Sequence, residues 1–262
     1  MQQYINFDED LQPKQPHNTF KFKCVVGCKL CCSMNDVALY PFDIMYLCNF
    51  LNISSSEFHN KYTTFDFDTN AKILRCYLKT NPVCVFFDNQ KACTVYDARP
   101  VRCRTFPVGR MFNEDDTVEH FLPRQKCPGF ESKQKHTIQS WIDNCGISDR
   151  KEMIKDWNKF IIQTKNRKDL PLEDEFFKMF FMKIFYDFDN ELSKVSNATN
   201  KEIERDDILG RMEHLYFLSK IYLDNIDKWK EGYKQTYANN ESNNHNNNNH
   251  NNNNHNNSIN SI

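Results

Sequence analysis

Clustered cysteines are the feature of this sequence that most restricts how the chain can fold. Eleven cysteines occur in 262 residues, and ten of them lie between residues 21 and 130. The opening twenty residues have neither the basic segment nor the apolar segment of a secretory signal, so we expect a reducing compartment. Disulfides are disfavoured in such a compartment, and clustered thiols then indicate metal or redox chemistry.

The first group of thiols is compact. Four cysteines, Cys24, Cys28, Cys31 and Cys32, fall within nine residues. A metal held by thiolates needs its sulfurs to converge on one point, and two or three residues between ligands allow a tight loop to achieve this. Side chains of neighbouring residues diverge on an extended backbone, so Cys31 and Cys32 can serve different partners. One of them could ligate the local centre while the other reaches a second centre or packs.

The second group is spread over a longer stretch and consists of Cys84, Cys93, Cys103 and Cys127. The segment from Cys84 to Cys93 has the pattern of a hairpin with a thiol at each end, and Pro128-Gly129 is a turn signal. Arginines flank Cys103, and a neighbouring arginine lowers a thiol pKa and favours the thiolate that a metal requires. The two groups together predict eight metal ligands.

The three other cysteines have simpler explanations. Cys48 falls on the apolar face of a predicted helix and Cys145 at the end of another, so we expect both to be buried as small hydrophobic side chains. Cys76 lies eight residues before Cys84 and fits either a ninth ligand or a spare thiol.

Charged residues near the thiols allow two interpretations each. The arginines around Cys103 could bind an anionic substrate or pair with thiolates and nearby acids, and we favour the pairing for Arg99, Arg102 and Arg104. Asp43 could support the metal ligands or act in catalysis, yet an acid near a helix start is also favoured by the helix dipole, and we prefer that simpler role.

The two thiol groups and the residues around them together resemble the CxxCxxCC-type cysteine-cluster family. Its members are described as zinc- or iron-chelating proteins, YkgJ-like proteins or Fe–S oxidoreductases. The resemblance covers residues 20 to 145 and is most specific in the run CTVYDARPVRCRTFP, which begins at Cys93. One departure is the spacing of Cys24 and Cys28, which have three residues between them where the family name gives two. The resemblance implies metal binding by Cys24, Cys28, Cys31, Cys32, Cys84, Cys93, Cys103 and Cys127.

One branch of this family resembles flagellin lysine N-methylases, which are thought to use an iron–sulfur cluster in methyl transfer. Cys24, Cys28 and Cys31 also have the spacing that radical-SAM enzymes use to leave one iron open for SAM. However, Cys32 follows directly and would close that open site. The sequence also has only six glycines and lacks the strand–helix alternation of a barrel enzyme. A cluster-dependent protein lysine methyltransferase is therefore the second hypothesis, since function does not follow from a shared scaffold.

An all-thiolate ligand set suits both zinc and iron–sulfur clusters. Eight cysteines could hold two zinc ions, one cluster plus one zinc, or two clusters, and we place a 4Fe–4S cluster ahead of zinc. The positions of His17, His59, His120 and His136 relative to these cysteines do not match the spacing of zinc-finger ligands. The leading hypothesis is thus an iron–sulfur protein in electron transfer or redox enzymology, and the third is a structural zinc module for protein interaction.

Partners and location follow from charge and hydropathy. The formal net charge is −1, so no general attraction to nucleic acid or anionic membrane is expected. No window reaches the roughly 18 apolar residues of a spanning helix. We therefore expect a cytoplasmic protein without nucleic-acid or membrane partners, acting with a protein partner or substrate that the sequence does not identify.

The predicted fold is an α-rich α+β fold in which a small metal-stabilised cysteine-cluster domain precedes a helical domain. The expected divisions are a loose arm at 1–20, the cysteine-cluster domain at 21–135, the helical domain at 136–237 and a disordered Asn/His-rich tail at 238–262.

Capping and apolar spacing predict the individual helices. The expected helices are Pro41 to Leu51, a helix opened by Ser54 and Glu57, Thr137 to Asn144 with a stop at Gly146, one from Asp149, a buried Phe-rich helix from Pro171 and a last one from about Asp206 to Tyr233. Short extended pieces are expected from Cys76 to Phe106.

Overall fold

The computed structural model describes residues 13–25, 28–34, 37–69, 72–113, 115, 117–122, 127–167, 174–226 and 228. The chain divides into two compact units, Met1–Tyr216 and Phe217–Ile262. The segment 238–262, predicted to be a disordered tail, lies outside the described residues, as does most of the predicted arm at 1–20.

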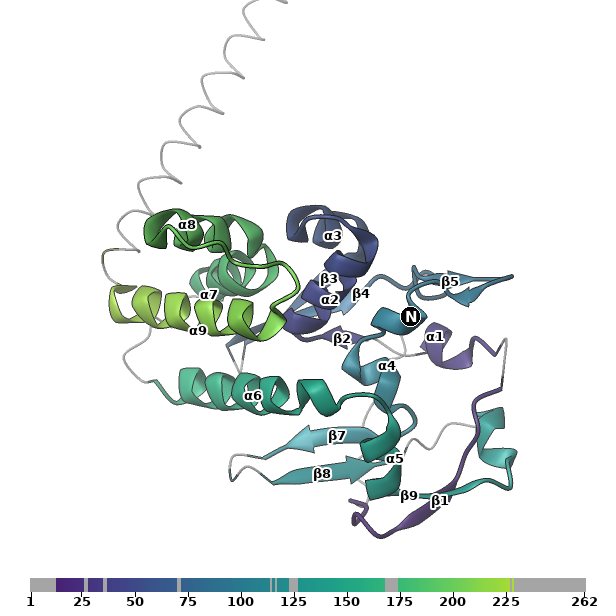
Figure 1. The fold of residues 1–262 in the computed structure, drawn as a ribbon. Coiled ribbons are helices and arrows are strands. Elements are labelled where there is room, and N and C mark those ends of the chain that lie inside the picture. Colours follow the sequence, from purple (N-terminus) through teal and green to yellow (C-terminus); the bar gives the residue numbers. More distant parts are fainter. Residues whose placement is uncertain are drawn as a thin grey trace, which may run out of the picture. The chain divides into compact units, whose positions relative to one another are not determined.

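Unit Met1–Tyr216 has the predicted α-rich α+β fold, in which helices accompany small antiparallel sheets (Figure 1). The largest sheet of the described residues has the strand order β2–β4–β3, with β2 at Ala38–Leu39, β4 at Ile73–Leu78 and β3 at Thr63–Asp68. The other strands form two-stranded pairs: β1 Thr19–Lys21 with β9 Lys135–Thr137, β5 Phe87–Asp88 with β6 Ala92–Cys93, and β7 Gly109–Phe112 with β8 Val118–Phe121.

Three predicted helices are confirmed together with their end signals. Helix α2 spans Pro41–Leu51 and has proline in its first turn. Helix α3 spans Ser55–Tyr62, and the Ser54 hydroxyl accepts a bond from the Glu57 N–H at 3.1 Å. Helix α5 spans Ile138–Asn144, and Gly146 follows it with a φ of +74°, the left-handed conformation that ends many helices.

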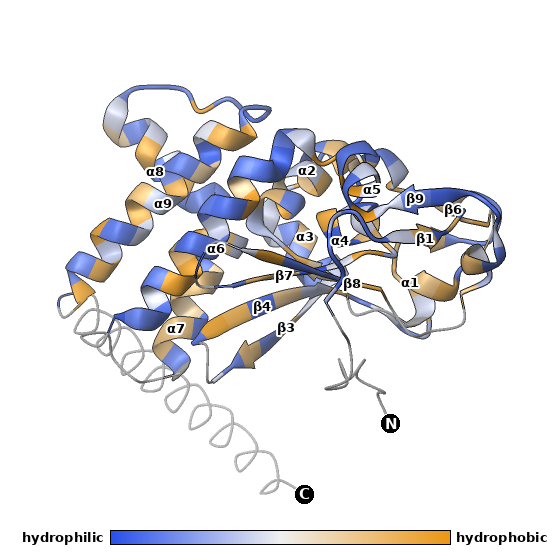
Figure 2. Ribbon diagram, turned by 90° about the horizontal axis from the view of Figure 1, so that it is seen from below, coloured by the Kyte–Doolittle hydropathy of each residue, from blue (hydrophilic) through white to orange (hydrophobic). Residues whose placement is uncertain are grey.

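The predicted Phe-rich helix is buried and forms the centre of an aromatic core. Helix α7 spans Asp174–Phe181 and continues into a π-helical turn at Met182–Tyr186. Helix α7 packs against β4, whose apolar colour is visible in Figure 2. Phe185 is fully buried, and its ring centroid lies 5.0 Å from that of Trp157 on α6, which spans Lys151–Asn166. Pro171, the predicted start of this helix, lies outside the described residues.

Several features of this unit were not predicted from the sequence, and helix α4, at Val101–Thr105, lies in a stretch expected to be extended. Strand β3 and the β7–β8 hairpin mix charged and apolar residues, which obscures their period of two. Helix α8, at Asp189–Thr199, buries only Leu192, Val195 and Glu191, so its apolar face is too narrow to give a clear helical period.

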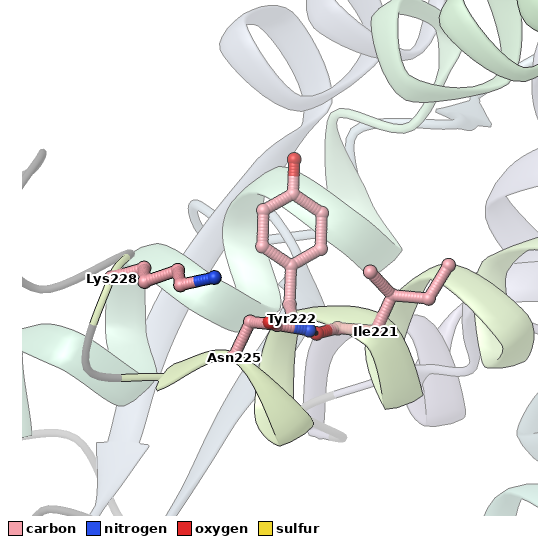
Figure 3. A pocket seen from close by; sticks show the side chains of 4 residues that line it. All are labelled: Ile221, Tyr222, Asn225 and Lys228. Carbon is pink, nitrogen blue, oxygen red and sulfur yellow. Dashed lines mark hydrogen bonds between the residues drawn. The ribbon is translucent and has the colours of Figure 1, made fainter.

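The predicted last helix is observed as α9 at Ile208–Asp224, and the boundary between the two units falls within it. In unit Phe217–Ile262 a hollow is lined by Ile221, Tyr222, Asn225 and Lys228 (Figure 3). Its lining contains no thiol or carboxylate, so it offers no strong metal ligands. No helix within the described residues is both long and apolar enough to span a membrane.

Candidate metal centre

The first thiol group lies on a turn and a short helix. The Cys28 N–H donates to the Val25 carbonyl at 3.0 Å, which bends the chain between Cys24 and Cys28. Helix α1, at Leu30–Met34, carries Cys31 and Cys32 on consecutive positions. Cys24 is exposed and the other three thiols are half-buried, so the group lies at the surface of the fold.

Cys84 and Cys93 reach this group through the β5–β6 hairpin. The Cys84 N–H donates to the Cys32 carbonyl at 2.8 Å, which joins the start of the hairpin to α1. Cys93 pairs with Phe87 across the hairpin, and the Asp88 carboxylate closes its turn. Helix α1 lies beside β5 and α4 in Figure 1. The predicted hairpin therefore exists and carries Cys93, while Cys84 precedes its first strand.

Cys103 lies on α4, a short helix at Val101–Thr105. A buried ion pair between Asp43 and Arg150 holds the start of this helix. The Val101 N–H donates to Asp43 Oδ1 at 3.0 Å, and Arg150 Nη1 donates to the same oxygen at 3.2 Å. Both charged side chains are buried, and Arg150 also donates to the Arg99 carbonyl at 3.1 Å. The pair thus fixes the backbone from Arg99 to Val101, just before Cys103.

Asp43 does form the predicted helix-start contact, because its Oδ2 accepts from the Tyr40 N–H at 3.2 Å. Its burial and its bond to Arg150 add a second role that the sequence did not reveal. Burial raises the pKa of Asp43 to about 6, while Arg150 and the backbone donors act in the opposite direction. Arg150 stands in a polar stretch at a helix start, and no sequence signal singled it out.

Cys127 is placed by a close approach between two segments. It precedes the 3-10 turn Pro128–Glu131, and the Lys23 N–H donates to the Gly129 carbonyl at 3.0 Å. A Cβ on Gly129 would lie 2.5 Å from the Phe22 ring, so only glycine fits here without a shift. Phe22 is buried among aromatic rings, which include Phe130 at 5.3 Å. This packing brings Cys127 to the strand that leads to Cys24.

The thiols act on one another electrostatically across these segments. Burial raises the pKa of Cys24, and the charges of Cys31, Cys28 and Cys127 raise it further. Burial also raises the pKa of Cys127, with contributions from Cys28 and Cys31. Because each thiolate opposes ionisation of the next, a bound cation would favour the ionised form of all of them.

The thiols of Cys31 and Cys32 are neighbours that affect each other's pKa. A hydrogen bond between their thiols raises the pKa of Cys32 and lowers that of Cys31 to about 7. The charges of Cys84 and Cys103 also raise the pKa of Cys32.

The neighbouring arginines do not all act as the sequence suggested. Burial raises the pKa of Cys24 and of Cys93, and the charge of Arg99 opposes this rise, as expected for a cation beside thiolates. Arg99 also contributes to the lowered pKa of Cys31. The pKa of Cys103 is nevertheless raised by its burial and by the charges of Cys84 and Asp43. Arg104 donates to the backbone carbonyls of Arg99 and Asp97, while Arg102 is exposed.

The three remaining cysteines differ from the eight in their surroundings. Cys48 is buried on α2, as predicted. Cys76 is buried in β4 opposite Phe65, so its surroundings are those of a core side chain and its pKa is raised to about 12 by burial. Cys145 is half-buried at the end of α5, and its thiol bonds to the Ile142 carbonyl at 3.2 Å.

The donor chemistry of the eight thiols fits zinc or iron, although they are not yet placed as a ligand shell. Within the described ranges, no three His, Cys, Asp or Glu side chains stand in the arrangement of a metal site. All eight are free thiols, and backbone hydrogen bonds join Cys84 to Cys32 and the residue before Cys24 to the turn after Cys127. Soft thiolates are the preferred ligands of zinc and iron–sulfur clusters, so the chemistry of this donor set suits such a group.

Fold and site together define a class: an α-rich α+β protein in which thiols from distant parts of the chain lie within electrostatic range of one another. The CxxCxxCC family, described as a putative zinc- or iron-chelating domain, matches residues 23–166. This chain belongs to that family, and the predicted resemblance is confirmed. A search of solved structures gave no match.

Proposed function

We propose that this protein binds an iron–sulfur cluster, of the 4Fe–4S type, with zinc as the alternative metal. The proposed ligands are Cys24, Cys28, Cys31, Cys32, Cys84, Cys93, Cys103 and Cys127. The supporting observation is that thiols from four separate segments lie near enough for their charges to raise the pKa values of Cys24, Cys32, Cys103 and Cys127. An all-sulfur donor set accepts either metal and favours iron–sulfur modestly.

The residues around the thiols support this use. The charge of Arg99 acts on Cys24, Cys31 and Cys93 in the direction that favours their thiolates, and it would offset part of the negative charge of a thiolate cluster. The Asp43–Arg150 pair holds the segment that carries Cys103. A bound cluster would supply one-electron chemistry, which makes an Fe–S oxidoreductase or electron carrier the leading functional class.

Anaerobic purification followed by metal and sulfide analysis tests this proposal. We expect a brown protein with broad absorption at the blue edge of the visible spectrum and equal amounts of iron and acid-labile sulfide. Zinc without iron would support the alternative, a structural zinc module for protein interaction. A protein that contains neither metal, and that takes up neither on anaerobic reconstitution, would contradict metal binding altogether.

Protein lysine methyl transfer rests on the family resemblance alone. The sheets of the described residues are small and antiparallel, unlike the barrel of radical-SAM enzymes. Incubation of the iron-loaded protein with labelled SAM and cell protein tests this alternative, and we expect no label above that of a heat-inactivated sample.

We also propose a cytoplasmic location, because a site built from reduced thiols is preserved best in a reducing compartment. A protein partner or substrate remains part of the proposal, since electron transfer requires a second redox protein or a substrate.

A further inference from the structure

We propose that Arg110 and His120, which are directly opposite each other in the β7–β8 hairpin, bind a small oxyanion, namely a phosphate or a carboxylate group. This inference goes beyond the proposed function, because the site uses none of the eight thiols. The observation that carries it is a buried guanidinium whose donors have neither an acceptor nor a counter-charge among the residues that the structure describes.

The two side chains lie on the same face of the hairpin. Arg110 of β7 is paired in register with His120 of β8, and directly opposite residues of an antiparallel pair point to the same side. Phe112, two residues further along β7, shares this face, and its ring centroid lies 4.9 Å from the guanidinium carbon of Arg110. The ring covers a flat side of the guanidinium, while the N–H donors lie in the guanidinium plane.

Both side chains have buried nitrogen atoms without a hydrogen-bond partner within the described ranges. These atoms are Nε and Nη1 of Arg110 and Nδ1 of His120. Most buried polar groups in proteins are hydrogen-bonded, and a buried donor without an acceptor costs free energy. A water molecule could accept these bonds, but it would not offset the charge of the guanidinium. An anion does both.

The groups that face Arg110 from other elements do not compensate its charge. Burial lowers the pKa of Arg110, and Tyr40 and Cys145 act on it in the opposite direction. Both of these groups are protonated at neutral pH, because burial raises the pKa of Tyr40 to about 12 and also raises that of Cys145. An arginine stays charged in proteins, so Arg110 is a cation in a place that holds no described anion.

The described carboxylates of the hairpin are used elsewhere. Glu119 precedes His120 and so points to the opposite face of β8, and its Oε1 accepts a bond from the Asn113 side chain at 3.4 Å. Asp115 lies between the two strands and accepts a bond from the Thr117 N–H at 3.0 Å. The counter-charge that this face fits is therefore an anion from outside the hairpin.

The chemistry of the two side chains selects an oxyanion. A guanidinium binds phosphate or carboxylate through two parallel N–H bonds, and His120 adds a third donor when Nδ1 carries a proton. Both residues are half-buried, so solvent reaches the site and a small anionic group can enter it. Phosphate and carboxylate share this chemistry, and separate probes distinguish them.

Calorimetric titration and thermal unfolding of the full chain test the proposal with sodium phosphate, sodium acetate and sodium chloride at equal ionic strength. We expect saturable binding of phosphate or acetate and none of chloride. The bound anion should raise the unfolding temperature by about 3–6 °C at about ten times its dissociation constant. Binding of phosphate alone identifies a phosphate group as the ligand, and binding of acetate alone identifies a carboxylate. Absence of saturable binding of both would overturn the proposal.

Arg110→Met is the decisive variant, because methionine replaces the buried cation with an apolar side chain. It should reduce the anion affinity about tenfold or more, and without the anion it should unfold at the wild-type temperature or above it. His120→Ala should also weaken binding. The matched control is Arg75→Met in β4, because Arg75 has a carboxylate partner in Asp68 at 2.9 Å, and this variant should keep the wild-type affinity.

Wild-type affinity in Arg110→Met or in His120→Ala, or an equal loss in Arg75→Met, would overturn the assigned site. Since a variant can fail to fold, the wild-type chain provides a second measurement through modification of arginines by phenylglyoxal, read by peptide mass spectrometry. The anion that binds should slow modification of Arg110 and leave that of Arg75 unchanged. Equal rates at Arg110 with and without the anion would contradict the proposal.

Discussion

Asp43 is fully buried, and its carboxylate accepts bonds from Tyr40, Val101 and Arg150. Burying a charge is unfavourable unless a partner compensates it, and removal of one partner leaves the other charge buried alone. The pair therefore fixes the start of α4, and its contribution to stability depends on both charges being present.

Asp43→Ala should lower the free energy of unfolding by about 3–5 kcal/mol, because Arg150 would remain buried without its carboxylate. It should also lower the metal bound per chain, since Val101 loses its acceptor near Cys103. Urea denaturation and metal analysis measure the two effects. The control is Asp143→Ala, which removes an exposed pair with Lys151 and should change neither quantity noticeably. Equal behaviour of the two variants would contradict the assigned role of Asp43.

His120 provides a pH-dependent contribution to stability. Burial and the charge of Arg110 lower its pKa in the folded protein, and its Nδ1 has no bond to another described residue. As pH falls below about 6.5, the unfolded chain binds a proton at this histidine before the folded protein does, so stability decreases. Wild-type unfolding free energy should therefore fall more steeply below this pH than that of His120→Gln.

Urea denaturation at a series of pH values checks this prediction. The exposed His17 offers a matched variant, His17→Gln, which should keep the wild-type pH dependence. Parallel curves for wild type and His120→Gln would show that His120 does not contribute.

At the scale of elements, the contact between β1 and the turn after Cys127 depends on Gly129. A Cβ there would lie 2.5 Å from the Phe22 ring and 3.0 Å from the Lys23 carbonyl oxygen. Gly129→Ala should lower the unfolding free energy by about 1–3 kcal/mol through overpacking and should reduce metal binding, because Cys127 is displaced from Cys24.

The matched control for this prediction is Gly109→Ala in β7, where a Cβ would meet Phe121 only at an ordinary 3.7 Å. Thermal unfolding and metal analysis of the two variants give the comparison. If Gly109→Ala were the more harmful substitution, the close approach at Gly129 would not be what places Cys127.

Elements with a local signal could be predicted from the sequence. Ser54 opens α3 and Gly146 ends α5 because caps act over a few residues, and these signals are readable without tertiary structure. Strand β3 pairs along its whole length with β4, and this pairing, rather than its own composition, makes it a strand.

The same division applies to the candidate site. The residue type and number of the thiols are visible in the sequence, so the candidate ligands could be named. The residues that these thiols lie beside could not be predicted. The bond from Cys84 to Cys32 and the packing of Phe22 against Gly129 depend on contacts between distant segments. Arg150 lies 107 residues from Asp43, and no local rule connects them.

For the whole molecule, a metal bound by these thiols would join segments from Cys24 to Cys127. Such cross-links restrict the unfolded chain more than the folded one and therefore stabilise the fold. Anaerobic removal of the metal with a chelator should lower the unfolding temperature and increase amide hydrogen exchange in α1 and the β5–β6 hairpin. Exchange in α7, inside the aromatic core, should change much less. Uniform changes, or none, would contradict a local structural role for the metal.

The β7–β8 hairpin has a practical consequence for studies of this protein. The hairpin lies between Cys103 and Cys127 in the sequence. Its paired strands keep Gly109 opposite Phe121 whatever the length of the turn between them. A reporter peptide inserted between Phe112 and Val118 would therefore extend outward without stretching the thiol-bearing segments. That turn is a suitable place for a fluorophore or an affinity handle with which to follow metal loading in living cells.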